Sequence, residues 1–254
     1  MTKSPLSIMA LVDALALPPG EPPRRVPKST LAENVPTAAD RQLIETKLGR
    51  LEWLAAINPA TTGIATGEAD GLTIDTINLL AARTRGAVPP RLAEIIHRAI
   101  PKPVILFHRD ETTETGAAMS LAAKRTAERE LGHVVTTAVH DTGPLSLGDE
   151  PFLNELALSR LPTRNLNTLY VGLIERVEAL TAAHCIGRPF RLADGRDEIA
   201  RWRTALADIA DHKAEIARLS ALIRKEKRLA VKVELGETAR QSKMRLDAAQ
   251  AILK

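Results

Sequence analysis

The chain has 254 residues, of which 44% are hydrophobic and 26% are charged, values typical of a globular protein with a buried core. Only three Phe, two Trp and one Tyr are present, which argues against a nucleic-acid site that stacks several bases on aromatic rings. The formal charge is +4 and uneven: residues 196–254 hold 14 Lys and Arg against 9 Asp and Glu, whereas residues 1–195 hold 21 against 22. The positive excess therefore lies in the C-terminal part of the chain.

An apolar segment near the N-terminus has some features of a secretion signal. Asp13 interrupts it, however, and no cleavage site of small residues follows. Its apolar residues have helical spacing, which predicts an amphipathic helix; they are Ile8, Leu11, Val12 and Leu15. No segment is apolar over the length needed to cross a bilayer, and the single cysteine, Cys185, excludes an internal disulfide. We therefore expect a cytoplasmic protein that does not enter the membrane.

Residues 18–36 are rich in proline and basic residues, which predicts an extended arm on the domain surface. Thr37 then has the features of a helix N-cap, with Asp40 three residues later in the capping-box position. We expect a helix from Thr37 to about Asn58, because apolar residues recur there with helical spacing and only Lys47 interrupts them. The buried face of this helix would consist of Leu43, Ile44, Leu48, Leu51, Leu54 and Ile57.

The middle of the chain has the pattern of a sheet with packed helices. Pro89 and Pro90 predict the start of a helix that Pro101 ends. Its inward side would carry Leu92, Ile95, Ile96 and Ala99. Strands are expected at 59–66, at 71–83 with a bulge or bend between its halves, at 104–108, at 117–123 and at 133–140. These elements predict an α/β fold of the α+β kind, with a mixed, partly antiparallel sheet of four or five strands.

The rest of the chain is predicted to be helical, with helices at 151–161 and 165–186. From Asp197 onward, apolar residues recur three and four apart in a coiled-coil-like seam, with Lys213 and Ser220 in the two remaining seam positions. The apolar members of the seam are Ile199, Trp202, Leu206, Ile209, Ile216 and Ile223. A break near 229–236 and a last helix at 237–253 predict an antiparallel hairpin. Four regions are expected: a helix and arm (1–36), a core domain (37–145), a helical extension (146–195) and the hairpin tail (196–254).

The common catalytic motifs are not found in the sequence. It contains no glycine-rich phosphate loop and no GxSxG elbow, and its histidines are too dispersed for a zinc site with one cysteine. His184 and Cys185 are adjacent, so a helix would point them in different directions and they would not form a nucleophile–base pair. A metal-dependent nuclease would need acids on two strands, and only the first, Asp75, is present. We expect no metal and no other cofactor.

Two groups of basic residues are candidates for an anionic ligand. His97 and Arg98 end a predicted helix, where they would complement the helix dipole, and the ring of His97 is expected near the surface. A functional alternative is that these two converge on one anionic ligand with Lys124, Arg125, Arg24, Arg25 and Lys28. The second group lies where the tail hairpin should turn, and a basic tip there would attract phosphates. It consists of Arg224, Lys225, Lys227 and Arg228.

Several segments of the chain resemble the bacterial domain of unknown function family 4391. They are PKSTL (27–31), TAADRQLI (37–44), LEWLAAINPATTGI (51–64), HRAIPKPVILF (97–107), SLAAKR (120–125) and EKRLAVKVEL (226–235). The most specific are the His-Arg-Ala-Ile-Pro-x-Pro and Ser-Leu-Ala-x-Lys-Arg segments. Lys102 stands where the family pattern has a tyrosine, and Gly236 where it more often has asparagine. The family has no assigned activity, but its members tend to be encoded beside helicases and DNA methyltransferases in operons of the restriction-modification or phage-defence type.

Three hypotheses follow. The first is a non-enzymatic accessory subunit of a DNA-processing or phage-defence complex, with a helicase or DNA methyltransferase as the suspected partner. In this hypothesis the hairpin seam packs on itself, on a second copy or on that partner. The second is a sequence-independent DNA-binding module that uses the basic tip and the arm. The third is a divalent-metal nuclease centred on Asp75.

Overall fold

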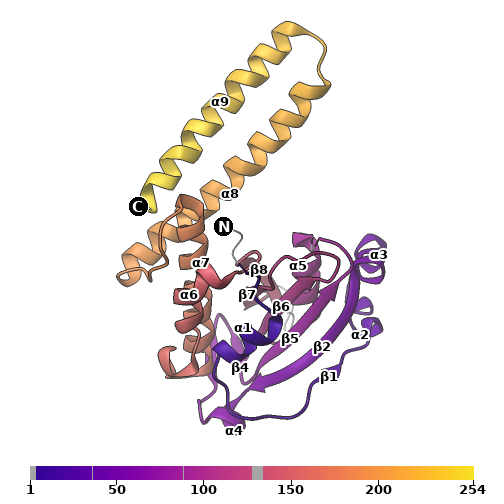
Figure 1. The fold of residues 1–254 in the computed structure, drawn as a ribbon, viewed down its shortest axis with the longest axis vertical. Coiled ribbons are helices and arrows are strands. Elements are labelled where there is room, and N and C mark those ends of the chain that lie inside the picture. Colours follow the sequence, from indigo (N-terminus) through magenta and orange to yellow (C-terminus); the bar gives the residue numbers. More distant parts are fainter. Residues whose placement is uncertain (1–3, 36, 88, 128–133) are drawn as a thin grey trace. The chain divides into compact units, whose positions relative to one another are not determined.

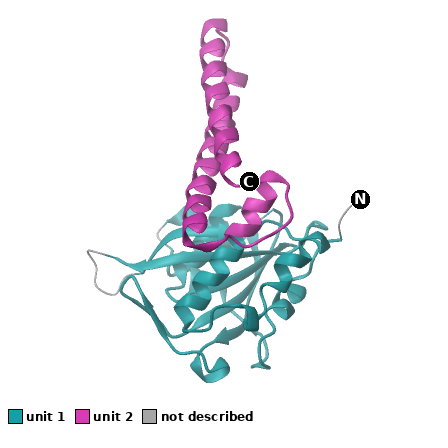
Figure 2. Cartoon of the chain, turned by 90° about the vertical axis from the view of Figure 1, so that its left-hand side faces the viewer, with its two compact units in different colours: residues 1–177 teal, residues 178–254 magenta. Residues whose placement is uncertain are grey.

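The structure, a computed structural model, describes residues 4–35, 37–87, 89–127 and 134–254 (Figure 1). The chain divides into two compact units, Met1–Val177 and Glu178–Lys254, which Figure 2 shows in different colours. Among the described helices, none has both the length and the apolar character needed to span a lipid bilayer.

The first unit is built on a six-stranded sheet with the order β1-β2-β5-β6-β7-β8. β5 and β6 are parallel, and every other neighbouring pair is antiparallel. The strands are β1 (Arg24–Arg25), β2 (Leu48–Ile57), β5 (Ile77–Thr84), β6 (Val104–Asp110), β7 (Ala118–Thr126) and β8 (Val134–Asp141). A separate hairpin pairs β3 (Gly67–Ala69) with β4 (Leu72–Ile74). The predicted mixed α+β class is confirmed, with six strands in the main sheet rather than four or five.

Helices cover both faces of this sheet (Figure 1). One face packs against α2 (Lys28–Ala32), α3 (Ala38–Lys47) and α5 (Pro90–Ala99). This aliphatic core includes Leu31, Ile44, Leu51, Leu80, Leu92, Ile95, Ile96, Val104 and Leu106. The opposite face packs against α1 (Ile8–Ala14), which contacts β6, and against the first half of α7 (Leu166–Ile186). The predicted helices at 8–15 and 90–99 are confirmed.

The predicted helix from Thr37 to Asn58 is wrong in its second half. Thr37 does cap α3 by accepting a hydrogen bond from the Asp40 N–H, but the helix ends at Lys47 and β2 follows directly. Leu51 pairs with Ala82 of β5 and is 1% exposed. The spacing of the leucines fits the apolar stripe of a helix, so local periodicity did not distinguish a helix from a strand here. Pairing with the distant strand β5 made this segment a strand.

Two neighbouring predictions also need correction. Residues 59–62 form the short helix α4 (Pro59–Thr62), because Asn58 and Thr61 make a reciprocal capping box at its start. The expected strand at 71–83 is interrupted at Asp75 and Thr76, and its halves, β4 and β5, belong to different sheets. The arm at 18–36 contributes β1 and α2. The strand predicted at 133–140 is β8, and His133 lies outside the described residues.

The second unit contains the end of α7 and an antiparallel pair of long helices. These are α8 (Gly195–Lys225) and α9 (Leu229–Ile252), joined by a turn at 226–228. The predicted hairpin is confirmed, but the break expected at 229–236 is wrong, because those residues begin α9. The helix expected at 151–161 is also shorter: α6 (Glu150–Asn154) is followed by a single 3-10 turn at Leu158–Arg160.

The predicted seam of α8 holds near its start and shifts farther along. Trp202 and Ile209 are 3% and 2% exposed, as expected of seam residues. Lys213 and Ser220, however, are exposed, and Leu219 is buried instead. A straight helix has 3.6 residues per turn, so its buried side moves relative to a strict seven-residue repeat.

Candidate functional site

His97 lies inside the first unit. Its ring is 0% exposed and its Nε2 is 2.9 Å from the hydroxyl oxygen of Ser120 on β7. The prediction that this ring would be near the surface is therefore wrong. The buried side of α5 is wider than expected, because it includes Ala93 and His97 in addition to the predicted residues. Burial lowers the pKa of His97 to about 3, so the ring is neutral near neutral pH.

Lys124 meets His97 as a cap on the end of α5. Its Nζ donates to the main-chain carbonyls of His97 at 2.7 Å and Lys102 at 3.1 Å, and also to that of Ile100. Burial lowers the pKa of Lys124 to about 7. The donors of this ammonium thus point at the helix end, where cations complement the free carbonyls.

The other members of the predicted anion cluster have different neighbours. Arg98 is exposed and pairs with Glu94 at 2.8 Å, while a guanidinium nitrogen of Arg125 donates to the Thr126 carbonyl at 3.4 Å. Arg24 lies over the ring of Trp53, with its guanidinium carbon 5.3 Å from the centroid. The pKa of Lys28 is lowered by burial, and then by the nearby charges of Arg85 and Arg25. The structure thus brings His97 and Lys124 together, and places the arm residues in another basic neighbourhood.

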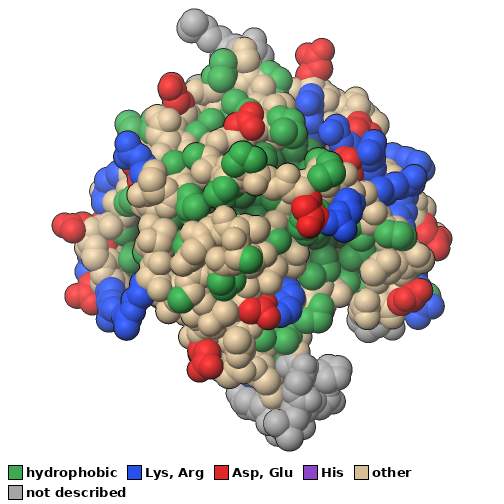
Figure 3. Space-filling model, turned by 90° about the horizontal axis from the view of Figure 1, so that it is seen from below, with side chains coloured by type: hydrophobic (Ala, Val, Ile, Leu, Met, Phe, Trp, Pro, Cys, Tyr) green, Lys and Arg blue, Asp and Glu red, His purple; other side chains and the backbone are tan. Residues whose placement is uncertain are grey.

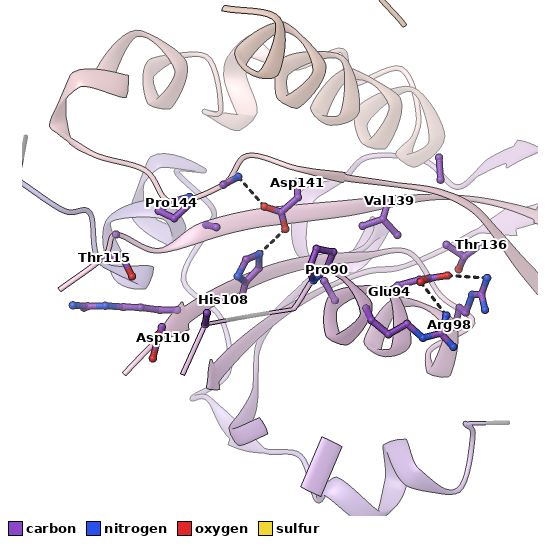
Figure 4. Close-up of a pocket in the computed structure, with 18 of the residues that line it drawn as sticks. Pro90, Glu94, Arg98, His108, Asp110, Thr115, Thr136, Val139, Asp141 and Pro144 are labelled. Atoms are coloured by element: carbon purple, nitrogen blue, oxygen red, sulfur yellow. Dashed lines mark hydrogen bonds and ion pairs between the residues drawn. The ribbon is translucent and has the colours of Figure 1, made fainter. Parts of the chain in front are cut away.

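A groove of about 700 Å³ lies between α5 and β8, with side chains of β6 and β7 beneath it (Figure 4). At its inner end the His108 ring is 2.6 Å, Nε2 to Oδ2, from the Asp141 carboxylate. The two side chains point toward each other in Figure 4, while the Glu94–Arg98 pair lies at the opposite end. Residues that line the groove include Pro90, Ala93, Glu94, Arg98, His108, Asp110, Ala118, Thr136, Val139, Asp141 and Pro144.

The His108–Asp141 pair gives this groove its chemistry. His108 is 8% exposed, and Asp141 also accepts a hydrogen bond from the Gly143 N–H at 2.7 Å. Burial opposes ionisation of Asp141, but the hydrogen bonds and charge of His108, with the Gly143 N–H, hold its pKa below the usual range. Such a pair can hold or transfer a proton, and the mostly apolar walls suit a small organic group. Sequence reasoning missed the pair, because the two residues are 33 positions apart.

The turn of the α8–α9 hairpin carries the predicted basic cluster. All four of its cations are exposed, and Glu226 lies among them, accepting main-chain hydrogen bonds from Lys227 and Arg228 at 2.8 Å each. Large apolar side chains are exposed near the same turn: Leu222 at 41%, Leu229 at 77% and Val233 at 65%. Leu222 also lines a shallow depression there, together with Leu235 and four charged residues, Lys225, Glu226, Lys227 and Arg228.

The predicted partner interface on α8 packs partly within the second unit. Trp202 and Ile209 belong to a buried cluster with Ala205 and Leu253, and Leu206 packs against its edge. The guanidinium groups of Arg188 and Arg191 lie 4.6 Å from the centroid of the Trp202 ring. Ile199, Ile216 and Ile223 are half-buried.

Asp75, the acid of the nuclease hypothesis, is held by a lysine. Its two carboxylate oxygens accept hydrogen bonds from Lys102 Nζ at 2.5 and 2.6 Å. That hydrogen bond keeps the pKa of Asp75 below its usual range. Within the described ranges, no group of three or more His, Cys, Asp or Glu side chains is placed to hold a metal ion.

The molecule thus consists of a mixed α+β unit with a ligand-sized groove and a helical hairpin with a basic turn. Comparison with known proteins agrees with the sequence resemblance. The family model described as "Domain of unknown function (DUF4391)" matches residues 15–246. The chain belongs to that family. No curated protein and no solved structure matched the chain.

Proposed function

We propose that the protein is a non-enzymatic binding subunit of a DNA-processing or phage-defence complex, which docks on a protein partner through the turn end of its hairpin. The observation that carries this proposal is the exposure of Leu229 and Val233, at 77% and 65%. They are four residues apart on α9 and so lie on one helix face. Exposed apolar groups ringed by charge are typical of binding surfaces.

The charges around this face define the partner's chemistry. Lys225, Lys227 and Arg228 are exposed beside the apolar side chains, and Glu226 is the only acid in the turn. A complementary surface would have an apolar centre and an acidic rim. Because members of the family tend to be encoded beside helicases and DNA methyltransferases, we propose an enzyme of one of these two classes as the partner that carries that surface.

The test is co-purification of the full chain with those two neighbours. We expect the double variant Leu229→Ser and Val233→Ser to lose the partner, because it removes the apolar contact and leaves the hairpin interior unchanged. The matched control is Met244→Ser with Ile252→Ser, which removes side chains 64% and 50% exposed near the other end of α9. This control should retain the partner.

Three results would contradict the proposal. One is equal recovery of the partner with the Leu229 and Val233 variant. Another is a native chain that binds neither neighbour. The third is self-association that the same variant abolishes, since the surface would then serve a second copy of the chain.

The second candidate function is sequence-independent DNA binding by the turn. Its support is that Arg224, Lys225, Lys227 and Arg228 are exposed within five residues and only Arg228 pairs with an acid in the turn, Glu226. Replacing all four cations with glutamine should weaken duplex binding and flatten its salt dependence. An unchanged salt dependence would count against this role.

A further inference from the structure

Three adjacent strands of the main sheet each place an arginine on the same level of one face. Arg50 of β2 is paired with Arg83 of β5, and Arg83 is in parallel register with Arg109 of β6. Residues paired across neighbouring strands point to the same side of a sheet. Neighbouring strands are about 4.8 Å apart, so the three side chains leave the sheet over about 10 Å. We call these three residues the arginine row.

The row lies on the face opposite α3 and α5. Leu51 and Ala82, which alternate with its members along β2 and β5, belong to the core beneath those helices. Arg50 and Arg83 are accessible on the other face, with side chains 55% and 40% exposed. Arg50 and Arg83 therefore lie outside the α5–β8 groove and the hairpin turn, whereas Arg109 is also among the residues that line the groove.

The positive charge of the row is only partly compensated. Glu52 approaches Arg50 at 2.7 Å and Arg83 at 3.5 Å, and Glu111 approaches Arg83 at 3.4 Å. The Nε of Arg109 is buried and has no hydrogen-bond partner in the part of the chain that the structure describes. Like charges placed side by side on neighbouring strands destabilise a sheet. A bound anion would relieve that repulsion and satisfy the free donor.

Further basic residues belong to β1, to the end of β5 and to the arm at residues 18–36. Arg25 of β1 is paired with Glu52 and so faces the same side as the row. Arg85 follows the end of β5; burial lowers the pKa of Lys28, and the charges of Arg85 and Arg25 lower it further. In Figure 3 the largest group of Lys and Arg side chains lies at the upper right of the view, with smaller groups on its left side. By strand register, Arg25 and the row extend over β1, β2, β5 and β6, a shape that suits a linear polyanion.

We propose that the arginine row binds consecutive phosphate groups of a nucleic-acid backbone, with duplex DNA as the ligand. The guanidinium fork matches the geometry of a phosphate and binds it with two hydrogen bonds. Base stacking has no platform here, because Phe107 on this face is 0% exposed and Trp53 faces the other side with the core. Contact is therefore made with the backbone and does not depend on sequence.

This inference concerns the first unit and does not rest on the hairpin function. The experiment measures binding of labelled duplex DNA to the full chain by fluorescence anisotropy over a salt series. The test variant is Arg50→Gln with Arg109→Gln, which leaves Arg83 to pair with Glu52 and Glu111. The matched control is Arg41→Gln with Arg164→Gln, two exposed arginines outside the row.

Each phosphate contact contributes about 0.9 to the slope of log affinity against log salt concentration. We therefore expect the test variant to lower that slope by about 2, with at least a tenfold loss of affinity at low salt, and the control to match the native chain. Arg109→Lys keeps the charge and removes the fork, so it should lose less affinity than Arg109→Gln. If the double variant does not fold, the difference in affinity between Arg109→Lys and Arg109→Gln tests the proposal instead.

Several outcomes would overturn the proposal. The row has no such role if the test variant binds duplex DNA like the control. If loss of binding follows only the four-glutamine variant of the hairpin turn, the DNA site is the turn and not the row. If inorganic phosphate or a mononucleotide at millimolar concentration displaces the duplex completely, the row holds a single phosphate and not a backbone.

Discussion

Lys124 on β7 donates a hydrogen bond from its ammonium group to the main-chain carbonyl of His97 on α5, at 2.7 Å. The carbonyls of Ile100 and Lys102 accept from the same nitrogen. One side chain from the sheet thus donates hydrogen bonds to main-chain carbonyls at and just beyond the C-terminal end of α5. Helix ends leave carbonyls without partners inside the helix. The contact therefore stabilises both the helix and its position on the sheet.

Replacing Lys124 with methionine should lower the free energy of unfolding by about 2 kcal/mol, because charged hydrogen bonds to buried carbonyls are lost. Methionine keeps most of the side-chain volume, which isolates the ammonium. The measurement is urea unfolding at a pH below the pKa of Lys124, where the group is charged. Lys102→Met removes an exposed ion pair with Asp75 and should cost no more than about 1 kcal/mol. Equal losses in the two variants would show that Lys124 is not a specific cap.

The fold class could be predicted from the sequence because its strongest elements carry local signals. α5 begins at two prolines and presents an apolar stripe, while β6 is a short aliphatic run after a proline. β2 could not be predicted in this way. Its leucines have a spacing that suits a helix, and only pairing with β5, more than twenty residues later, makes it a strand.

The candidate sites also differ in whether local sequence signals could predict them. The basic turn of the hairpin was predictable, because its residues are consecutive and stand between two helical patterns. The arginine row and the His108–Asp141 pair depend on strand register, which the sequence does not show. His97 was placed wrongly because its neighbours suggested one narrow apolar face, whereas the strands beneath α5 cover a wider one.

The buried ring of His97 should make the protein sensitive to acid. Burial lowers its pKa to about 3, whereas an unfolded histidine titrates near 6.5. Between these values the unfolded chain binds a proton that the folded chain does not, so the free energy of unfolding falls as the pH falls. The contribution is at most about 1.4 kcal/mol per pH unit. Urea unfolding of the native chain and His97→Gln at several pH values should show curves that diverge below pH 6.5; parallel curves would contradict this assignment.

The only tyrosine of the chain, Tyr170, completes the sheet where β6 and β7 separate. Those strands pair over three residue pairs, and beyond them the phenol accepts from the Ala122 N–H at 2.9 Å and lies 3.0 Å from the Val104 carbonyl. Tyr170→Phe leaves these buried groups without a partner, so we expect a loss of about 1–3 kcal/mol in urea unfolding.

An alkaline titration gives an independent check on Tyr170. Burial raises the pKa of its phenol, so ultraviolet absorbance should show no ionisation near pH 10 while the protein stays folded. With a single tyrosine in the sequence, the signal needs no assignment. A normal titration of the folded protein would show that the phenol is accessible to water.

Leu219 and Ser220 test the register of the hairpin. A strict seven-residue repeat places Ser220 in the seam of α8, but the structure buries Leu219, which is 1% exposed, and leaves Ser220 in solvent. Leu219→Ala should cost about 3 kcal/mol, since it removes buried methyl groups and leaves a cavity. Ser220→Ala should change the free energy of unfolding by less than about 0.5 kcal/mol, as expected of an exposed substitution. Both are measured by urea unfolding of the full chain followed by circular dichroism of the helices. A larger loss for Ser220→Ala than for Leu219→Ala would mean that the helices pair in the heptad register that the sequence predicts.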